Sequence, residues 1–191
     1  MAAPRLAKLL PDQLDDDQRA VYDAIAGGRR AQGPQLFRLR DDEGGLEGPF
    51  NAFLLQPRLG LALQELGSAV RYRTALSDRA REIAILVVAV QVDSGFEWYA
   101  HEAVGRHVGL TDDELAGLRD QRYDALADDH ERLVAQTCQR LLADADLDDA
   151  AYAQAAESLG LPCLFELTTL VGYYALLALQ LRVFRVDAPG A

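Results

Sequence analysis

The sequence predicts an all-α protein formed by a single domain over residues 1–191. Two observations support this fold class. Apolar residues recur at helical spacing in one segment after another, and residues that cap helix starts precede several of these segments. No segment keeps the alternation of apolar and polar residues that is typical of a half-buried strand. A chain of this length forms one domain with a substantial core.

The N-terminal part predicts two helices separated by a long loop. The first follows the acidic residues 15–17, which favour the start of a helix dipole, and ends at Gly27 and Gly28. Residues 32–51 are rich in Gly, Pro, Asp and Arg, and so predict a loop. Loops of this length in compact domains are often functional. The second helix is expected over residues 57–72.

A strongly apolar helix is expected over residues 78–92, after an N-cap at Ser77. Its β-branched residues would also suit a buried strand, but its length and charged start favour a helix. Residues 93–95 break it. The other predicted helices cover residues 95–108, a short stretch after the capping box at Thr111, and residues 128–143, 147–160 and 162–183.

The composition excludes several classes of function. The chain carries 19 Lys and Arg against 30 Asp and Glu, a formal net charge of −11. This charge disfavours binding to nucleic acid and to anionic membrane surfaces. A substrate with a carboxylate would need a local arginine site. We therefore expect a small-molecule substrate, and no nucleic-acid or membrane partner.

Two segments bear on the location of the protein. Residues 1–10 contain too short an apolar run for a secretory signal. The longest apolar stretch, Leu164–Val183, includes Glu166 and Arg182 and is interrupted by Gly172. It is interpreted as a buried helix rather than a membrane span. The protein is expected in the cytoplasm.

The two cysteines, Cys138 and Cys163, do not form a C-x-x-C motif. They predict neither a disulfide framework nor a zinc motif. Because a free cysteine packs like a small hydrophobic residue, both are interpreted as buried thiols.

The residues suited to chemistry gather around the break at 93–95. Ser94, Glu97 and His101 are spaced i, i+3 and i+7, which places them on one helix face. Glu82 lies in the apolar stripe of the preceding helix and can face His101 if the two helices pack antiparallel. A carboxylate and an imidazole in a partly dry place form a proton-transfer pair.

Each of these residues also has a structural interpretation. Ser94 and Glu97 fit the S-x-x-E pattern of a capping box. Glu82 could pair with an arginine at position 71, 79 or 81. His101 could be a core histidine with satisfied hydrogen bonds.

The remaining aromatic and imidazole side chains carry weaker signals. Trp98 is interpreted as a core aromatic residue, and Tyr99 as a core residue or a pocket wall. His107 and His130 lie among polar neighbours and are expected at the surface. Because H-E-x-x-H is absent, we expect no metal site, and we expect no cofactor.

Three separated motifs together resemble the carboxymuconolactone decarboxylase family, which includes the alkylhydroperoxidase-D-like proteins. Flanking segments at 48–52 and 165–174 extend the similarity to about residues 45–185 and leave a loose tail at 187–191. The motifs are Arg79-x-Arg81-Glu82-Ile83-x-Ile85-Leu86, Phe96-Glu97-Trp98-Tyr99-x-His101 and Gly109-Leu110-Thr111.

The resemblance implies an alkylhydroperoxidase-D-like helical bundle that forms a homotrimer or homohexamer, with its site near subunit contacts. In the peroxidase branch, a glutamate, a C-x-x-C pair and a histidine form a proton relay with redox thiols. The glutamate corresponds to Glu82 and the histidine to His101, but the cysteine positions hold Ser94 and Glu97. Peroxide reduction needs a thiolate and a resolving partner, so thiol peroxidase activity is disfavoured.

These observations favour a cofactor-free lyase or isomerase that acts on a small organic acid, lactone or carbonyl compound. His101 would shuttle the proton, Glu82 would orient and tune His101, and Glu97 would be a second acid or base or a polar wall. An arginine at position 71, 73 or 81 would hold a substrate carboxylate. The predicted substrate-binding residues are Ser94, Tyr99, Arg71, Phe50 and Asn51. The alternatives are an alkylhydroperoxidase-like antioxidant protein and a non-catalytic binding or assembly protein of the same fold.

Overall fold

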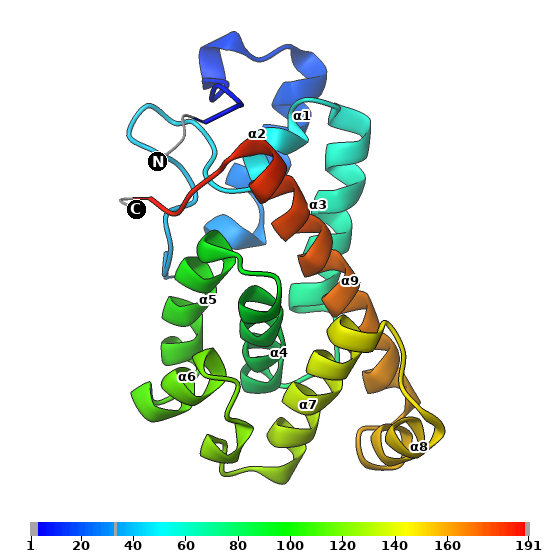
Figure 1. The fold of residues 1–191 in the computed structure, drawn as a ribbon. Helices are drawn as coiled ribbons and strands as arrows, with labels where there is room; N and C mark the ends of the chain where they lie inside the picture. The colour runs from blue at the N-terminus through cyan, green and yellow to red at the C-terminus, as the bar shows by residue number, and fades with distance from the viewer. Residues whose placement is uncertain (1–3, 33, 190–191) are drawn as a thin grey trace.

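A computed structural model describes residues 4–32 and 34–189, and its regular structure in these ranges is helical (Figure 1). A single bridge pair, Arg40 with Leu46, is the only β-type pairing among the described residues. The all-α prediction is therefore confirmed. The helices are α1 (Asp16–Ala26), α2 (Phe50–Phe53), α3 (Pro57–Tyr72), α4 (Asp78–Gln91), α5 (Gly95–His107), α6 (Asp112–Arg119), α7 (Asp129–Asp144), α8 (Asp149–Ser158) and α9 (Leu161–Phe184), with 3-10 turns η1 (Pro11–Gln13), η2 (Arg29–Ala31) and η3 (Tyr123–Ala125).

The helix starts agree with the capping signals in the sequence. Asp15 forms a capping box with Gln18, and Thr111 forms one with Glu114. The Ser77 side chain accepts a hydrogen bond from the Ala80 amide at the start of α4. These local bonds satisfy amide groups that a helix leaves without partners at its N-terminus.

The predicted 32–51 loop differs from the structure at one end. Its last two residues, Phe50 and Asn51, begin the short helix α2, directly after Pro49. Proline fixes φ in the helical range and needs no amide partner, so it suits a helix start. Gly33, inside this predicted loop, lies outside the described residues.

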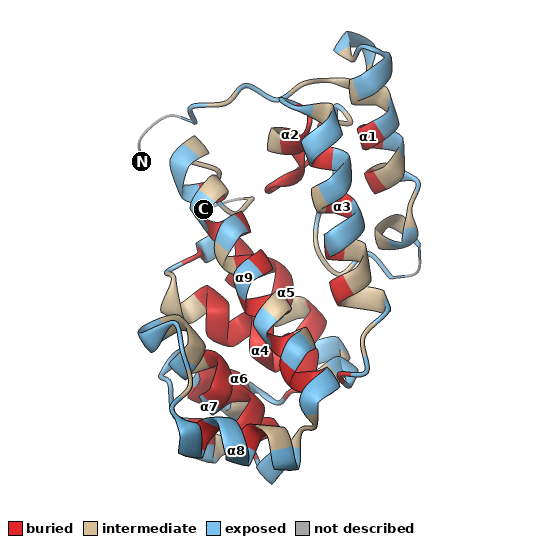
Figure 2. Cartoon of the chain, turned by 90° about the vertical axis from the view of Figure 1, so that its right-hand side faces the viewer, coloured by how far each residue is buried: buried red, intermediate tan, exposed pale blue. Residues whose placement is uncertain are grey.

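Helix α4 forms the centre of the fold. It packs against α5, α7 and α9, and its residues from Ala80 to Ala89 are buried. Figure 2 shows α4 as an almost continuous buried element, whereas the surrounding helices also carry exposed residues. A central apolar helix needs partners on all sides, which explains why α4 shows no polar stripe. Any polar side chain on α4 is therefore held away from water.

Helix α9 is buried on one face only, which corrects the interpretation of a buried helix. By length and composition alone it could span a membrane, and 44% of its most apolar window is buried inside the fold. Its inner face packs against α4 and α7, and Glu166 accepts hydrogen bonds from the amides of Ala75 and Leu76. Its outer face is apolar and exposed, with Phe165 72% and Leu179 61% accessible.

The first described residues of the chain lie close to the end of α9 (Figure 1). The amide of Arg5 donates to the carbonyl of Phe184, and Asn51 accepts from the Leu9 amide. Of the predicted loose tail, residues 187–189 are described, while residues 190 and 191 lie outside the described residues, as do residues 1–3 of the N-terminal segment.

Candidate active site

A buried carboxylate–imidazole pair joins α4 to α5. Glu82 projects from the first turns of α4, and His101 from the middle of α5. The Glu82 Oε2 atom lies 2.6 Å from His101 Nδ1. Glu82 is fully buried and His101 is 4% exposed. The contact predicted from the packing of two consecutive helices is therefore present.

The surrounding charges keep Glu82 ionised. Burial acts to raise its pKa, but the hydrogen bond to His101 and the positive charges of Arg71 and Arg81 outweigh burial and lower it. The Arg71 and Arg81 guanidinium nitrogens lie 3.9 and 3.8 Å from Glu82 Oε1. The contact with His101 and the two nearby cations together favour the charged form of this buried carboxylate.

Burial and two arginines keep His101 neutral. Its pKa is lowered because burial disfavours the charged ring, and Arg71 and Arg30 add repulsion that the Glu82 carboxylate only partly offsets. A neutral ring that faces an ionised carboxylate through Nδ1 carries its proton on that nitrogen. The other nitrogen, Nε2, is then a free base.

Glu97 faces the free nitrogen of His101. Its Oε2 atom lies 3.5 Å from His101 Nε2. Complete burial raises the pKa of Glu97 to about 8, against the opposing influence of Arg71 and Arg30. Glu97 is therefore protonated at neutral pH, and its Oε1 atom has no hydrogen-bond partner among the described residues. The neutral His101 ring therefore lies between two carboxyl groups: ionised Glu82 at Nδ1 and protonated Glu97 at Nε2.

A small cavity opens beside this line. Its free volume is about 20 Å³, which is room for about one water molecule. Three buried polar atoms at its edge have no hydrogen-bond partner among the described residues: Arg71 Nε, Glu97 Oε1 and the Tyr173 hydroxyl. Because buried polar groups are nearly always paired, such a cluster indicates a place for a polar guest. Other lining residues include Arg30, Phe37, Phe50, Phe96 and Tyr174.

The structure brings together five of the eight predicted site residues. Glu97, His101, Arg71 and Phe50 line the cavity, and Glu82 lies directly behind His101. Ser94, Tyr99 and Asn51 lie elsewhere. Tyr99 lines a hollow beside residues 35–40, and Asn51 bonds the backbone of Ala7 and Leu9.

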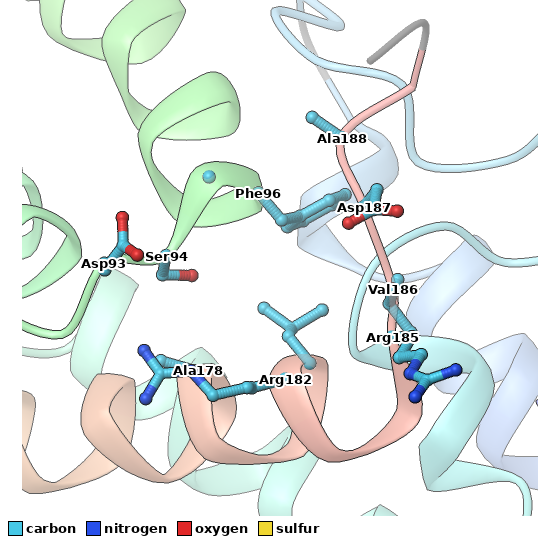
Figure 3. Close-up of a pocket in the computed structure, with 11 residues that line it drawn as sticks. Asp93, Ser94, Phe96, Ala178, Arg182, Arg185, Val186, Asp187 and Ala188 are labelled. Carbon is cyan, nitrogen blue, oxygen red and sulfur yellow. The ribbon is translucent and has the colours of Figure 1, made fainter. Parts of the chain in front are cut away.

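Ser94 lines a separate cavity of about 390 Å³ between the start of α5 and the end of α9. Figure 3 shows it opposite Asp187 and Ala188 of the C-terminal segment. The helical spacing argument does not apply to Ser94, because this residue precedes α5 with φ −101° and ψ 97°. The alternative of a capping box is wrong, since the Ser94 side chain makes no capping hydrogen bond.

The other structural alternatives are resolved by the same contacts. Arg79 pairs with Glu114 and Glu131 at 2.8 Å rather than with Glu82. Arg81 bonds Asp78 and approaches Glu82 only at 3.8 Å. The nearest partner of Glu82 is thus the imidazole. His107 and His130 are exposed, as predicted.

Sequence reasoning missed Arg30, Tyr173 and Tyr174 as cavity residues. The two tyrosines stood within a segment that resembled the family, so their position offered a signal. Arg30 offered none, because a single arginine after a helix end is usually a solvated side chain. Their location depends on how η2 and α9 pack around α3.

Both cysteines are buried and unpaired. Burial raises the pKa of Cys138, and also that of Cys163, so neither thiol is activated toward the thiolate. Neither residue lines the cavity beside His101. No group of three or more His, Cys, Asp and Glu side chains within residues 4–32 and 34–189 is arranged to hold a metal ion.

The fold and its interior define a helical bundle that holds a carboxylate–imidazole pair beside a polar cavity. Residues 57–139, which span α3 to most of α7, match the model of the Carboxymuconolactone decarboxylase family. The resemblance noted in the sequence is therefore confirmed over this segment. The match is shorter than the expected range of residues 45–185, and it contains Arg71, Glu82, Glu97 and His101 but neither Arg30 nor Tyr173.

Solved structures share the fold at low sequence identity. The alkylhydroperoxidase AhpD core of a peroxidase-related protein from Ralstonia eutropha superposes with a TM-score of 0.76 at 12% identity, covering 100% of this chain and 94% of that one. A protein of unknown function from Agrobacterium tumefaciens, described as an antioxidant defence protein AhpD, gives 0.67 at 17% identity, covering 76% and 100%. The debrominase Bmp8 in complex with 2,3,4-tribromopyrrole gives 0.74 at 10% identity, covering 98% and 95%. No curated protein sequence matches the chain.

Proposed function

We propose that the protein is a cofactor-free lyase or isomerase that moves a proton on a small organic acid, lactone or carbonyl compound. One observation carries this proposal: the buried line of Glu82, His101 and Glu97, with a 2.6 Å contact on one side of the imidazole and a protonated carboxyl on the other. When the surroundings of two neighbouring groups keep one deprotonated and the other protonated, the first can act as a base and the second as an acid in proton transfer.

In the proposed reaction each group has its own role. His101 Nε2, deprotonated and directed toward Glu97, removes a proton from the carbon next to a substrate carbonyl. The ionised Glu82 stabilises the imidazolium that forms and holds the ring in the required tautomer. Glu97 delivers a proton to the product carbon or oxygen and is reprotonated by His101. After one turnover, His101 is again neutral and Glu97 is again protonated, so the site is ready for the next substrate.

Of the three arginines considered from the sequence, Arg71 is the best suited to hold a substrate carboxylate. It lines the cavity, its Nε atom is unpaired, and its guanidinium approaches Glu82 no closer than 3.9 Å. Arg81 is occupied by Asp78, and Arg73 does not line the cavity. The planar guanidinium fork suits a carboxylate in two-point contact.

Proton exchange in deuterated buffer tests the proposal. The protein is incubated with a panel of small acids, lactones and carbonyl compounds, and proton NMR follows the loss of signal next to the carbonyl. We expect His101→Ala to lower the exchange rate at least a hundredfold, in the range typical of a general base. His107→Ala, at the exposed end of the same helix, is the matched control and should leave the rate unchanged.

Two results would reject the proposed chemistry. One is exchange that persists in the His101→Ala variant. The other is a panel that binds without any enzyme-dependent exchange, which would favour the non-catalytic binding or assembly protein that the sequence left open.

A thiol peroxidase remains the second candidate, because two structural neighbours carry peroxidase or antioxidant descriptions. Buried thiols with raised pKa values argue against it. We expect a chromogenic disulfide reagent to label Cys138 and Cys163 at least a hundredfold more slowly in the native protein than in denaturant. Rapid labelling of a native thiol, together with peroxide consumption that needs a thiol reductant, would instead support the antioxidant function.

We further propose that the protein forms a homotrimer or homohexamer in the cytoplasm. The exposed apolar face of α9, which includes Phe165, Leu176 and Leu179, supports self-association because large exposed apolar patches usually mark contact sites. Light scattering coupled to size exclusion measures the oligomer size directly, and a monomer at micromolar concentration would exclude this assembly.

A further inference from the structure

The cavity beside His101 carries an excess of positive charge. Two arginines, Arg30 and Arg71, line it. One ionised carboxylate, Glu82, lies on the far side of the His101 ring from the cavity, while His101 and Glu97 are neutral at pH 7. Arg81 is balanced by its contact with Asp78. Two positive charges against one negative charge leave a net charge of about +1 around this largely enclosed cavity.

Arg30 is held at this cavity by uncharged contacts. Its Nε atom donates to Gln64 Oε1 at 3.1 Å, and its guanidinium lies 5.2 Å from the centre of the Phe50 ring. No ion pair involving Arg30 is present within the part of the chain that the structure describes. A guanidinium is always charged in proteins, so an arginine without a counter-ion at a cavity favours an anion there.

A glycine makes this placement possible. A Cβ atom on residue 67 would lie 2.1 Å from the Tyr173 hydroxyl oxygen and 2.7 Å from Arg30 Nη2. The absence of a side chain at Gly67 therefore lets a hydroxyl and a guanidinium reach the same point from α9 and η2. Together with the unpaired Arg71 Nε, three donors from three separate elements converge on one cavity.

We propose that this cavity is a binding site for one small carboxylate monoanion, and that Arg30 is the residue that selects for its charge. The site is the one used in the proposed function, so the inference deepens that function by naming the substrate class. Arg30 and Arg71 neutralise the anion, the Tyr173 hydroxyl donates to it, and the protonated Glu97 supplies a further donor. A dianion would leave one charge uncompensated in a dry space, which is costly.

The small free volume of the cavity restricts the size of the group that can bind there. About 20 Å³ admits one water-sized group, so a carboxylate needs the lining side chains, such as Phe37 and Phe50, to move apart. Arg30 lies in η2, and Phe37 lies in the loop between η2 and α2. One segment therefore supplies both a positive charge and part of the cavity wall.

Calorimetric titration with sodium acetate, corrected with sodium chloride at equal ionic strength, tests this inference. We expect wild-type protein to bind acetate and not the neutral analogue acetamide. Arg30→Gln should weaken acetate binding at least tenfold. Arg29→Gln is the matched control, because Arg29 is exposed on the same turn with its guanidinium over Tyr72. It removes the same net charge and should change the affinity less than twofold.

A second measurement uses the wild type alone. Glu97 is faced by Arg71 of α3, Arg30 of η2, Glu82 of α4, His101 of α5 and the two tyrosines of α9. Because its pKa is raised to about 8, the cavity loses its net positive charge above that pH. Acetate affinity should therefore fall as pH rises beyond about 8, and an affinity that is constant from pH 7 to 9.5 would overturn the inference.

The outcomes separate the two proposals. If acetate does not bind, or if Arg29→Gln weakens it as much as Arg30→Gln, the monoanion site is rejected even when proton exchange on a neutral lactone supports the acid–base function. If acetate binds as expected but no compound exchanges protons, the monoanion site stands and the catalytic proposal fails.

Discussion

Replacing Glu82 by glutamine is expected to lower the free energy of unfolding by about 3–5 kcal/mol, the usual cost of removing one partner from a buried ion pair. The substitution keeps the size of the side chain and removes only its charge. Arg71, whose side chain is 11% exposed, then loses its carboxylate partner, and the His101 Nδ1 proton faces an amide instead of an anion. Chemical denaturation monitored by circular dichroism measures the loss.

A matched control is available at a second carboxylate, Glu47. It is also largely buried, but its partners Lys8 and Arg38 are 38% and 40% exposed and can turn to solvent. Glu47→Gln should therefore cost less than about 1 kcal/mol. Equal losses in the two variants would mean that Glu82 contributes no more to stability than a carboxylate with exposed partners. That result would contradict the charge arrangement inferred at His101.

Replacing Glu97 by glutamine is expected to have the opposite sign and to stabilise the protein by about 3 kcal/mol at pH 7. The folded protein raises the pKa of Glu97 from 4.5 to about 8 because the side chain is completely buried. At pH 7 the unfolded chain ionises this carboxyl, whereas the folded chain must keep it protonated. Glutamine is neutral in both states and avoids this cost.

The sign follows from proton binding. Between pH 4.5 and about 8 the folded state holds one more proton at Glu97 than the unfolded state, so the stability of the wild type falls as pH rises. The advantage of Glu97→Gln should accordingly be below about 1 kcal/mol at pH 5 and should reach its maximum above pH 8. Denaturation series at pH 5, 7 and 9 follow this difference.

Glu102→Gln provides the control on the same helix. Glu102 is partly exposed and pairs with Arg106, so its substitution should shift stability little at any of the three pH values. If Glu97→Gln behaves like Glu102→Gln, Glu97 is ionised in the folded protein, and it cannot act as the acid of the proposed reaction. A stabilising substitution that also lowers proton exchange would show that this residue serves function at the expense of stability.

The helix boundaries could be predicted well because the signals that set them are local. Capping side chains such as Ser77 and Thr111 bond amides three residues away, and glycine stops such as Gly27 act within one turn. The same locality explains the success with Glu82 and His101. They lie on consecutive helices joined by a short break, so only one packing step separates their positions in the sequence from their contact.

Exposure and facing direction were harder to predict. Composition alone indicated that α9 is apolar, but it did not show that only one face meets the core, because both faces carry leucine and other large apolar residues. Ser94 shares a helical spacing with Glu97, yet it adopts an extended backbone just before the helix and faces another cavity. Periodicity has meaning only for residues that are inside the helix.

By itself, the sequence determined the all-α class and most helix limits, and it placed Glu82 and His101 on consecutive helices where they could meet. Only the tertiary structure decided which arginines and tyrosines surround that pair. Arg30, Arg71 and Tyr173 come from η2, α3 and α9 and line one cavity, and Arg30 and Tyr173 can approach each other because Gly67 leaves space between them. This arrangement depends on the packing of segments that are distant in the sequence. No local pattern encodes it, because arginine and tyrosine side chains are also common on solvated surfaces.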